Sequence, residues 1–236
     1  MKSLIFFLFA IIFPLREVVD VQISIPTHQH DIFFNYSNDN FSQVIVYNNT
    51  PNEITAYIKN SNYFALNLDF RILPNASFIA NLHPELRKNV RDLVDNCLTF
   101  KPYFLNISSF LEGHITYSDL DLPQDAVSVI TSKKANCIGY ANLVQVYLDA
   151  VGIKNRIVKG FYLKNSLEKK KDSNGKLVPV PHRWLEIFLP NGMKFFYDPQ
   201  HQRFSADYIA IRDEVDFKAV KKFEVNLVKK SKKIIN

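Results

Sequence analysis

The first third of the chain alternates apolar and polar positions as β-strands do. Residues 21–25, 31–36 and 43–47 are rich in β-branched and aromatic side chains, and Asn-rich turns separate them. Residues 64–70 alternate again. This pattern predicts a small antiparallel β-rich unit over residues 21–80, ahead of the main domain.

The apolar positions change to helical spacing at residue 84. Over residues 84–98 they fall on one stripe, with proline in the first turn, which predicts an amphipathic helix. The stripe turns Cys97 toward the core, where we interpret it as an unreactive buried thiol. Shorter helices are expected over residues 106–112 and 124–132.

The clearest helical pattern begins at Cys137. Apolar residues follow it at i+4, i+7, i+11 and i+14, and Gly152 is placed to end the helix as a C-cap. A hairpin turn at residues 190–192 joins two of the strands expected after this helix. The strands expected in this part of the chain are 156–163, 182–189, 193–197, 208–211 and 223–228.

The N-terminus has the form of a secretory signal. Met1-Lys2-Ser3 precedes an entirely apolar run over residues 4–15, which is shorter than the about 20 residues that a membrane-spanning helix needs. We expect a signal peptide over residues 1–20, cut near residue 20, and hence an exported protein, periplasmic or secreted. A buried N-terminal strand or helix and retention as an uncleaved membrane anchor are the alternatives.

The composition limits the class of protein. With 236 residues, 47% of them hydrophobic, the chain suits one domain with a modest extension, and the main domain is expected over residues 81–236. Two cysteines exclude a disulfide scaffold and a four-cysteine zinc site. No glycine-rich phosphate loop occurs. We interpret His28-x-His30 as polar surface rather than as part of a metal site.

The positive charge is concentrated in two segments. Residues 218–236 hold seven Lys and one Glu (+6), and residues 164–181 hold five Lys, one Glu and one Asp (+3), so the rest of this chain of net charge +6 carries −3. This distribution favours solvated charge over a nucleic-acid surface, and we expect no nucleic-acid partner. A weak contact of the Lys-rich tail with a membrane or an anionic polymer stays open. The loop 164–181 is interpreted either as a mobile insertion or as a lid or site for acidic substrates.

Three residues from different segments form a candidate for nucleophilic catalysis. Cys137 stands at the first turn of a helix, where free N–H groups and partial positive charge stabilise a thiolate and could hold an oxyanion. His182 begins a strand, and its imidazole could remove the thiol proton. Asp198 ends the next strand of the same hairpin, approximately opposite His182, and could orient the imidazole and stabilise its charged form.

Around these three residues the chain resembles the transglutaminase-like superfamily of papain-like thiol enzymes. The motifs of that family are Cys-x-Gly/Asp-Tyr-Ala, Gly-Ile, Arg-x-Val-x-Gly, His-x-Trp-x-Glu and a closing Asp-Pro, in that order. The resemblance covers about residues 83–212. The matching segments are Cys137-Ile138-Gly139-Tyr140-Ala141, Gly152-Ile153, Arg156-Ile157-Val158-Lys159-Gly160, His182-Arg183-Trp184-Leu185-Glu186 and Asp198-Pro199.

The resemblance implies an α+β fold with a papain/transglutaminase-like core, in which the nucleophile helix packs on an antiparallel sheet, preceded here by the small β-rich extension. It implies a catalytic triad of Cys137, His182 and Asp198, with no metal and no organic cofactor. The residues that resemble the family framework, and to which no catalytic role is carried over, are Arg156, Trp184 and Glu186.

The chain departs from the family pattern just before the nucleophile. Lys133-Lys134-Ala135-Asn136 stands where the family has glycine or another small residue, so the entrance to the site is expected to be more basic and polar. The second oxyanion donor of such enzymes is often an aromatic or amide side chain well upstream. Tyr103, Tyr117 and Gln124 are the candidates for it.

The sequence therefore predicts an exported, monomeric thiol enzyme that hydrolyses an amide bond of a protein or peptide substrate through a thioester. Transfer of the acyl group to an amine, which gives cross-linking, is one alternative, because the nucleophile that reaches the thioester first decides the product. A non-catalytic binding module that keeps the fold is the other.

Overall fold

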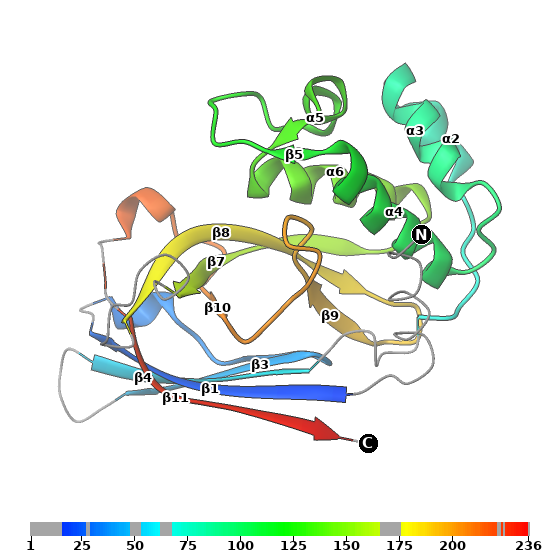
Figure 1. Cartoon of the computed structure of the whole chain (residues 1–236). Helices are drawn as coiled ribbons and strands as arrows, with labels where there is room; N and C mark the ends of the chain where they lie inside the picture. Colours follow the sequence, from blue (N-terminus) through cyan, green and yellow to red (C-terminus); the bar gives the residue numbers. More distant parts are fainter. Residues whose placement is uncertain are drawn as a thin grey trace, which may run out of the picture.

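An antiparallel sheet curves back on itself, and a layer of helices covers one of its outer faces (Figure 1). The structure is a computed structural model that describes residues 16–26, 29–47, 53–61, 68–165, 176–220, 223 and 225–235. The expected α+β class is confirmed. Within the described part of the chain, no helix has the length and apolarity needed to cross a membrane.

The strands are β1 (Arg16–Pro26), β2 (Tyr36–Ser37), β3 (Phe41–Tyr47), β4 (Glu53–Ser61), β5 (Thr116–Tyr117), β6 (Lys134–Ala135), β7 (Asn155–Asn165), β8 (Lys176–Phe188), β9 (Lys194–Tyr197), β10 (Tyr208–Ala210) and β11 (Val225–Ile235). Nine of them form the large sheet, in the order β10-β7-β8-β11-β1-β4-β3-β2, with β9 paired to β8 beside that path. The short strands β5 and β6 form a separate parallel pair.

The helices are α2 (Ala76–Ala80), α3 (Pro84–Val94), α4 (Phe100–His114), α5 (Ala126–Ser132) and α6 (Cys137–Ala150), with short 3₁₀ turns η1 (His30–Ile32) and η4 (Phe217–Ala219). Figure 1 shows α2 to α6 together on one side of the sheet, over β7, β8 and β9. The strands β1, β3, β4 and β11 lie on the opposite side of β7 and β8, so the molecule has three layers.

Two hydrophobic clusters hold these layers together. One lies between the helices and β8 with β9, and the other fills the inside of the curved sheet. Successive residues of the central strands point to opposite clusters, because side chains alternate along a strand. Leu185 and Tyr197 belong to the first cluster, Trp184 and Phe196 to the second, and all four are fully buried.

One edge of strand β8 pairs with a single strand, and its other edge pairs with two different strands. β7 pairs along one edge, whereas on the other edge β11 pairs with the first two residues of β8 and β9 pairs with residues 185–188. Residues 178–184 have no strand partner on this edge. Pro179 and Pro181 lie in this gap, where proline, which lacks an N–H group, is tolerated. The gap also contains His182.

Two buried amide side chains of the N-terminal unit, Asn40 just before β3 and Gln43 within it, pair with the main sheet much as a strand would. Asn40 accepts a hydrogen bond from the N–H of Phe196 and donates to its carbonyl oxygen, both at 2.9 Å. Gln43 accepts from the N–H of Ala210 at 2.8 Å and donates to its carbonyl oxygen at 3.0 Å. The N-terminal strands thereby hold β9 and β10, which precede and follow the loop that begins at Asp198.

The predicted helices occur, with different ends. α5 and α6 lie where they were expected. The helix predicted over residues 84–98 stops at Val94, because Asp95 leaves the helical conformation and Asn96 has a φ of 67°. The helix predicted over residues 106–112 is longer than expected, since Phe100 and Phe104 extend its buried stripe toward the N-terminus.

The strand prediction is wrong in part of the N-terminal unit. Residues 31–36 form η1, an isolated bridge and the first residue of β2 rather than one strand. The consecutive residues Ile32 and Phe33 are both buried, which a strand with one buried face does not allow. Strand β4 was not predicted. Of the expected strand 64–70, residues 68–70 are not in a strand and the remainder lies outside the described residues.

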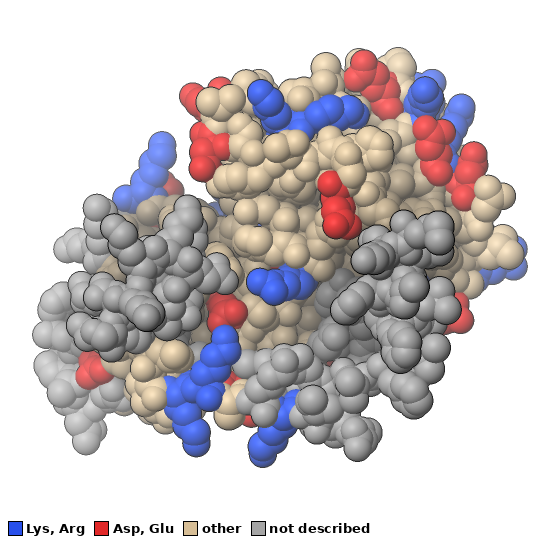
Figure 2. All heavy atoms as spheres, viewed as in Figure 1, with Lys and Arg blue, Asp and Glu red and all other residues tan. Residues whose placement is uncertain are grey.

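The Lys-rich end of the chain is a strand rather than a tail. β11 pairs antiparallel with β1 from Asn226 to Ile235, and the side chains of Lys229, Lys230 and Lys233 are exposed along it. On the face drawn in Figure 2, Lys and Arg side chains lie among Asp and Glu side chains around uncharged surface. The expected contact of this segment with a membrane or an anionic polymer stays a prediction.

The predicted signal peptide overlaps the first strand. β1 begins at Arg16, and residues 16–20 pair with residues 231–235. A cut near residue 20 would remove this part of the strand, whereas a cut before Arg16 would leave it whole. Residues 1–15, His28 and residues 166–175 of the charged loop lie outside the described residues, and the domain boundaries stay predictions.

Gly160 lets the central strands approach one another closely. It lies opposite His182 in the register of β7 and β8, and a Cβ at this position would come within 2.3 Å of the Trp184 ring and 2.2 Å of the Ile209 carbonyl oxygen. We therefore expect Gly160→Ala to lower the free energy of unfolding by about 2 kcal/mol, as overpacking of a core does. Urea denaturation measures this loss.

The matched control is Gly113→Ala in α4, where a Cβ would meet nothing within 4 Å. This change should raise the free energy of unfolding by up to about 1 kcal/mol, because alanine favours the helix more than glycine does. Equal stability of the Gly160→Ala variant and the wild type would contradict the close approach of β7, β8 and β10.

Candidate active site

Helix α6 begins at Cys137 because the preceding residue caps it. The side-chain oxygen of Asn136 accepts hydrogen bonds from the N–H groups of Ile138 at 2.9 Å and Gly139 at 3.4 Å. Two first-turn donors are therefore occupied, and the N–H of Cys137 is the one without a partner among the described residues. The expected group of free N–H donors is thus reduced to one. The Cys137 side chain itself is half-buried.

Gln124 lies against the start of this helix. Its Oε1 accepts from the N–H of Asn136 at 2.9 Å, and its Nε2 donates to the carbonyl oxygen of Leu122 at 2.9 Å, which leaves one Nε2 hydrogen for another acceptor. The glycine of the Cys-x-Gly motif makes room for this contact, because a Cβ on Gly139 would come within 2.3 Å of the Gln124 Oε1.

The two tyrosine candidates for the second oxyanion donor are placed differently. Tyr103 is fully buried and donates to the carbonyl oxygen of Tyr147 at 2.7 Å. Tyr117 is 48% exposed and donates to Asp119. The pKa of Tyr117 is raised to about 12, first by that hydrogen bond, with burial and the nearby Asp119 and Cys137 adding to it. Of the three candidates, Gln124 is the one that contacts the first turn of α6.

His182 lies in the middle of β8 rather than at its start. Its side chain is 5% exposed, and its ring stacks on that of Trp184 with the centroids 6.4 Å apart. Trp184 is fully buried. The imidazole therefore has little freedom to turn, and the indole sets the plane in which it lies.

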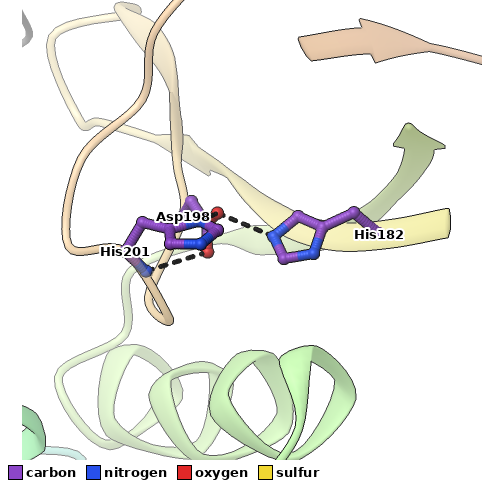
Figure 3. Close-up of side chains that lie close together, drawn as sticks. All are labelled: His182, Asp198 and His201. Atoms are coloured by element: carbon purple, nitrogen blue, oxygen red, sulfur yellow. Dashed lines mark hydrogen bonds and ion pairs between the residues drawn. The ribbon is translucent and has the colours of Figure 1, made fainter. Parts of the chain in front are cut away.

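Asp198 reaches His182 diagonally across the hairpin. Leu185 pairs with Tyr197, so continuing this register would put Asp198 opposite Trp184, two residues from His182 and on the same face of the sheet. The Nε2 of His182 is 2.7 Å from the Oδ2 of Asp198. An ionised carboxylate only accepts hydrogen bonds, so Nε2 carries the hydrogen and Nδ1 is left to face the thiol. The two residues lie side by side in Figure 3.

The surroundings of His182 favour its charged form. Burial of the ring lowers its pKa, but hydrogen bonds to Asp198 and to the Cys137 thiol, together with their charges, outweigh burial and raise the pKa from 6.5 to about 9. The pKa of the imidazole is therefore raised by both other members of the predicted triad. The assignment of these three residues as catalytic stays a prediction.

The carboxylate of Asp198 is kept ionised although it is fully buried. Burial alone would raise its pKa, but hydrogen bonds and charge from His182 and His201 outweigh burial and hold the pKa well below its usual range. The backbone N–H of Gln200 also donates to its Oδ1 at 2.9 Å. An ionised Asp198 can both fix the tautomer of His182 and stabilise its imidazolium.

His201 and Tyr208 were not predicted from the sequence. The Nδ1 of His201 is 2.6 Å from the Oδ2 of Asp198, and the hydroxyl of Tyr208 donates to the same oxygen at 2.5 Å. A local signal exists for His201 in part, because an Asp in a turn accepts from the N–H two residues on, here that of Gln200, and this turn keeps the next residue close to the carboxylate. Tyr208 lies on β10, and no local pattern of the sequence brings that strand to Asp198.

Among the described residues, the same cluster is the one group of three His, Cys, Asp or Glu side chains that could hold a metal ion. The ligand atoms of His182, Asp198 and His201 lie within 4.8 Å of one another (Figure 3). Both histidines donate to the carboxylate, so a metal ion would have to displace these hydrogens. The geometry is that of a hydrogen-bonded triad, and the chemistry it allows is proton transfer.

The remaining framework residues and the second cysteine have structural surroundings. Arg156 pairs with Glu186 at 2.7 Å across β7 and β8, and also with Asp213. Cys97 is half-buried, accepts a hydrogen bond from Asn106, and has its pKa raised by burial. This thiol lacks an imidazole partner within the described structure, as expected for an unreactive cysteine.

Fold and site together define an α+β protein in which the first turn of a helix presents a thiol to an imidazole on the adjacent sheet. Residues 88–199 match the model of the transglutaminase-like superfamily, and this stretch contains the nucleophile helix, β7, β8 and β9. The resemblance seen in the sequence is confirmed.

One solved structure supports the fold, and a second is less similar. A protein from Cytophaga hutchinsonii, described provisionally as a cysteine protease, is 12% identical over 94% of this chain and 89% of its own, with a TM-score of 0.50. The periplasmic domain of TgpA from Pseudomonas aeruginosa is 12% identical over 80% of this chain and 88% of its own, with a TM-score of 0.42. Comparison with curated proteins gave no match.

The raised pKa of His182 makes a prediction about stability and pH. Because its folded-state pKa of about 9 lies above the ordinary 6.5, the bound proton stabilises the fold fully below pH 6.5, and this stabilisation is lost as the pH rises through 9. Asp198→Asn removes the largest interaction that raises the pKa. The stability advantage of the wild type over this variant should shrink by about 2 kcal/mol between these two pH values.

Urea denaturation of both proteins across this pH range measures the difference. Comparing two variants cancels the titration of distant groups. An advantage that stays constant, or that grows with pH, would show that His182 does not hold its proton through Asp198.

Proposed function

We propose that this protein is an exported thiol-dependent amide hydrolase, similar to cysteine peptidases, that acts on a protein or peptide substrate. The observation that carries the proposal is that the His182 imidazole is bonded to the buried Asp198 carboxylate and also interacts with the Cys137 thiol. A thiol, a base and a group that orients the base are what nucleophilic catalysis at a carbonyl needs. Export is supported by the apolar run at residues 4–15.

In the proposed reaction Cys137 gives its proton to Nδ1 of His182, and its sulfur bonds to the carbonyl carbon of the substrate. His182 then returns the proton to the leaving nitrogen as the C–N bond breaks, which leaves a thioester and a free amine. Water attacks the thioester while His182 takes its proton, and the thiol is restored as the acid leaves. Asp198 stabilises the imidazolium in both halves of the reaction.

The negative charge that develops on the carbonyl oxygen needs two donors. One is the N–H of Cys137, the first-turn donor that the Asn136 cap leaves unoccupied. The other is the remaining Nε2 hydrogen of Gln124, whose side chain contacts the residue before the nucleophile. Both groups are fixed by the capped start of α6, so they need no reorganisation when the charge appears.

Two other functions compete with this proposal. Transfer of the acyl group to an amine uses the same thioester and the same residues. A binding module that only keeps the fold has no use for a fully buried, ionised Asp198 joined to an imidazole, and such a carboxylate costs free energy to keep. The presence of that pair favours an enzyme over a binding module.

The reactivity of the Cys137 thiol tests whether the protein is an enzyme. Iodoacetamide should alkylate Cys137 of the wild type at about pH 6, well below the ~8.5 at which an ordinary cysteine ionises, because the charged His182 stabilises the thiolate. His182→Ala should slow this reaction at least about tenfold. Peptide mapping by mass spectrometry follows the modification of each cysteine over time.

Cys97 is the internal control, because its pKa is raised by burial and it does not contact His182. Its alkylation should be slow at pH 6 and the same in both proteins. If Cys137 reacts as slowly as Cys97 and ignores the change at His182, the three residues do not act together and the enzyme proposal fails.

The products distinguish hydrolysis from transfer. Incubation of the protein with a protein or peptide library, with and without an added primary amine, should release the same free carboxylic acids in both reactions, because water is the proposed acceptor. Mass spectrometry identifies either product. Incorporation of the amine at the expense of the acid would assign the protein to the transferases and leave the thioester chemistry intact.

A further inference from the structure

Asp198 is shared by two histidines. His182 and His201 each place one ring nitrogen on the same oxygen, Oδ2, at 2.7 and 2.6 Å (Figure 3). His182 comes from β8, whereas His201 lies three residues after Asp198 in the loop that leaves β9. The proposed mechanism uses only the first of them.

His201 makes several contacts in the site, although it reaches the surface. Its ring lies 4.8 Å from that of Tyr162 and stacks on that of His182 with the centroids 5.3 Å apart. Its backbone N–H also approaches the Oδ1 of Asp198, at 3.4 Å. The side chain is 27% exposed, whereas those of His182 and Asp198 are 5% and 0% exposed.

The contact with Asp198 places a hydrogen on Nδ1 of His201, because this nitrogen faces a carboxylate, which only accepts hydrogen bonds. Its Nε2 lies 3.5 Å from the side-chain nitrogen of Gln200. His201 thus donates to Asp198 as His182 does, and to the same oxygen.

We propose that His201 is a positioning residue for the triad, which acts through Asp198 by holding its carboxylate ionised and aimed at the Nε2 of His182. This inference rests on the proposed function. Each donor on Oδ2 favours the ionised carboxylate and restricts its rotation about the Cβ–Cγ bond, and His201 is one of the donors on this oxygen. Tyr208 adds a third donor to the same oxygen.

Without His201 the buried carboxylate would lose a donor and take up a proton more easily. Hydrogen bonding and charge from His201 are among the causes that hold the pKa of Asp198 below its usual range, against the effect of burial. A less well ionised Asp198 stabilises the His182 imidazolium less, and the thiolate of Cys137 then forms less readily at acidic pH. The effect should vanish at alkaline pH, where a thiol ionises without help.

Other titratable groups surround this carboxylate and must stay constant in the test. Tyr208 of β10 and His182 of β8 contact it directly, Cys137 contacts His182, and Tyr197 and Arg203 lie within electrostatic range of Asp198 or Tyr208. None of them is changed by a substitution at position 201.

The experiment measures the rate of iodoacetamide alkylation of Cys137 between about pH 5 and pH 9 in three proteins. We expect His201→Ala to react about tenfold more slowly than the wild type at pH 6, as the loss of one hydrogen bond to a charged group does, and within about twofold of it at pH 9. His201→Asn should follow the wild type, because the Asn amide nitrogen is as far from Cβ as the imidazole Nδ1 and restores the donor.

A purely structural role would lower stability and change the rate at every pH, so urea denaturation is run in parallel. His83→Ala removes an exposed histidine elsewhere and is the matched control. If alanine prevents folding, His201→Leu fills the space without a donor and gives the same result.

Each outcome decides between the two proposals. If His201→Ala matches the wild type at pH 6 while His182→Ala does not, the function stands and the role of His201 is refuted. Equal losses in His201→Ala and His201→Asn would also refute it, because the donor would not matter. If Cys137 of the wild type is not activated, the proposed function fails, and the role of His201 fails with it.

Discussion

The site depends on keeping one fully buried carboxylate ionised. Taking a charge out of water costs several kcal/mol unless other groups replace its hydration. Around Asp198 the replacement consists of two imidazole N–H groups, a phenol O–H and backbone N–H groups of the loop that follows. These donors come from β8, the loop after β9 and β10, so three segments must arrive together before any of them is useful. The proposed chemistry is therefore a property of the assembled sheet and not of any single motif.

The divided edge of β8 makes this assembly possible. If β9 or β11 continued along the whole edge, the backbone of a neighbouring strand would fill the place where the chain turns away at Asp198. The prolines at positions 179 and 181 suit that gap, because no ladder is broken there. The N-terminal strands then secure the two sides of the loop through the amides of Asn40 and Gln43. The N-terminal unit matches no catalytic motif in the sequence, but it thus helps to position the site.

Local pattern was enough to predict the parts of the site, but not the way they are joined. The helix that begins at Cys137, the hairpin around residue 191 and the pairing of His182 with Asp198 all follow from periodicity and turn residues. The hairpin register differs by two residues from one that would place His182 opposite Asp198. The two side chains still meet, because diagonal neighbours on one face of a sheet are also within reach. Tyr208 and the two amides could not be predicted, since they act across more than 150 residues or from another strand, where no period in the sequence records the contact. The Lys-rich end was misread for a related reason: its partner is β1, at the other end of the chain.

Two carboxylates are buried among the described residues, Glu186 on β8 and Asp198 just after β9, and their partners distinguish them. Burial raises the pKa of Glu186 to about 7 against the opposing charge of Lys194. The ion-pair partner of this carboxylate is the guanidinium of Arg156, which only donates hydrogen bonds. This pair can stabilise the strands but has no partner that accepts a proton from a thiol. Asp198 is joined instead to two imidazoles, and through His182, whose pKa is raised to about 9, it acts on the thiol of Cys137. Burial of an acid alone therefore does not locate chemistry in this fold. Chemistry is located by a buried acid whose partner can gain and lose a proton and in turn interacts with a nucleophile.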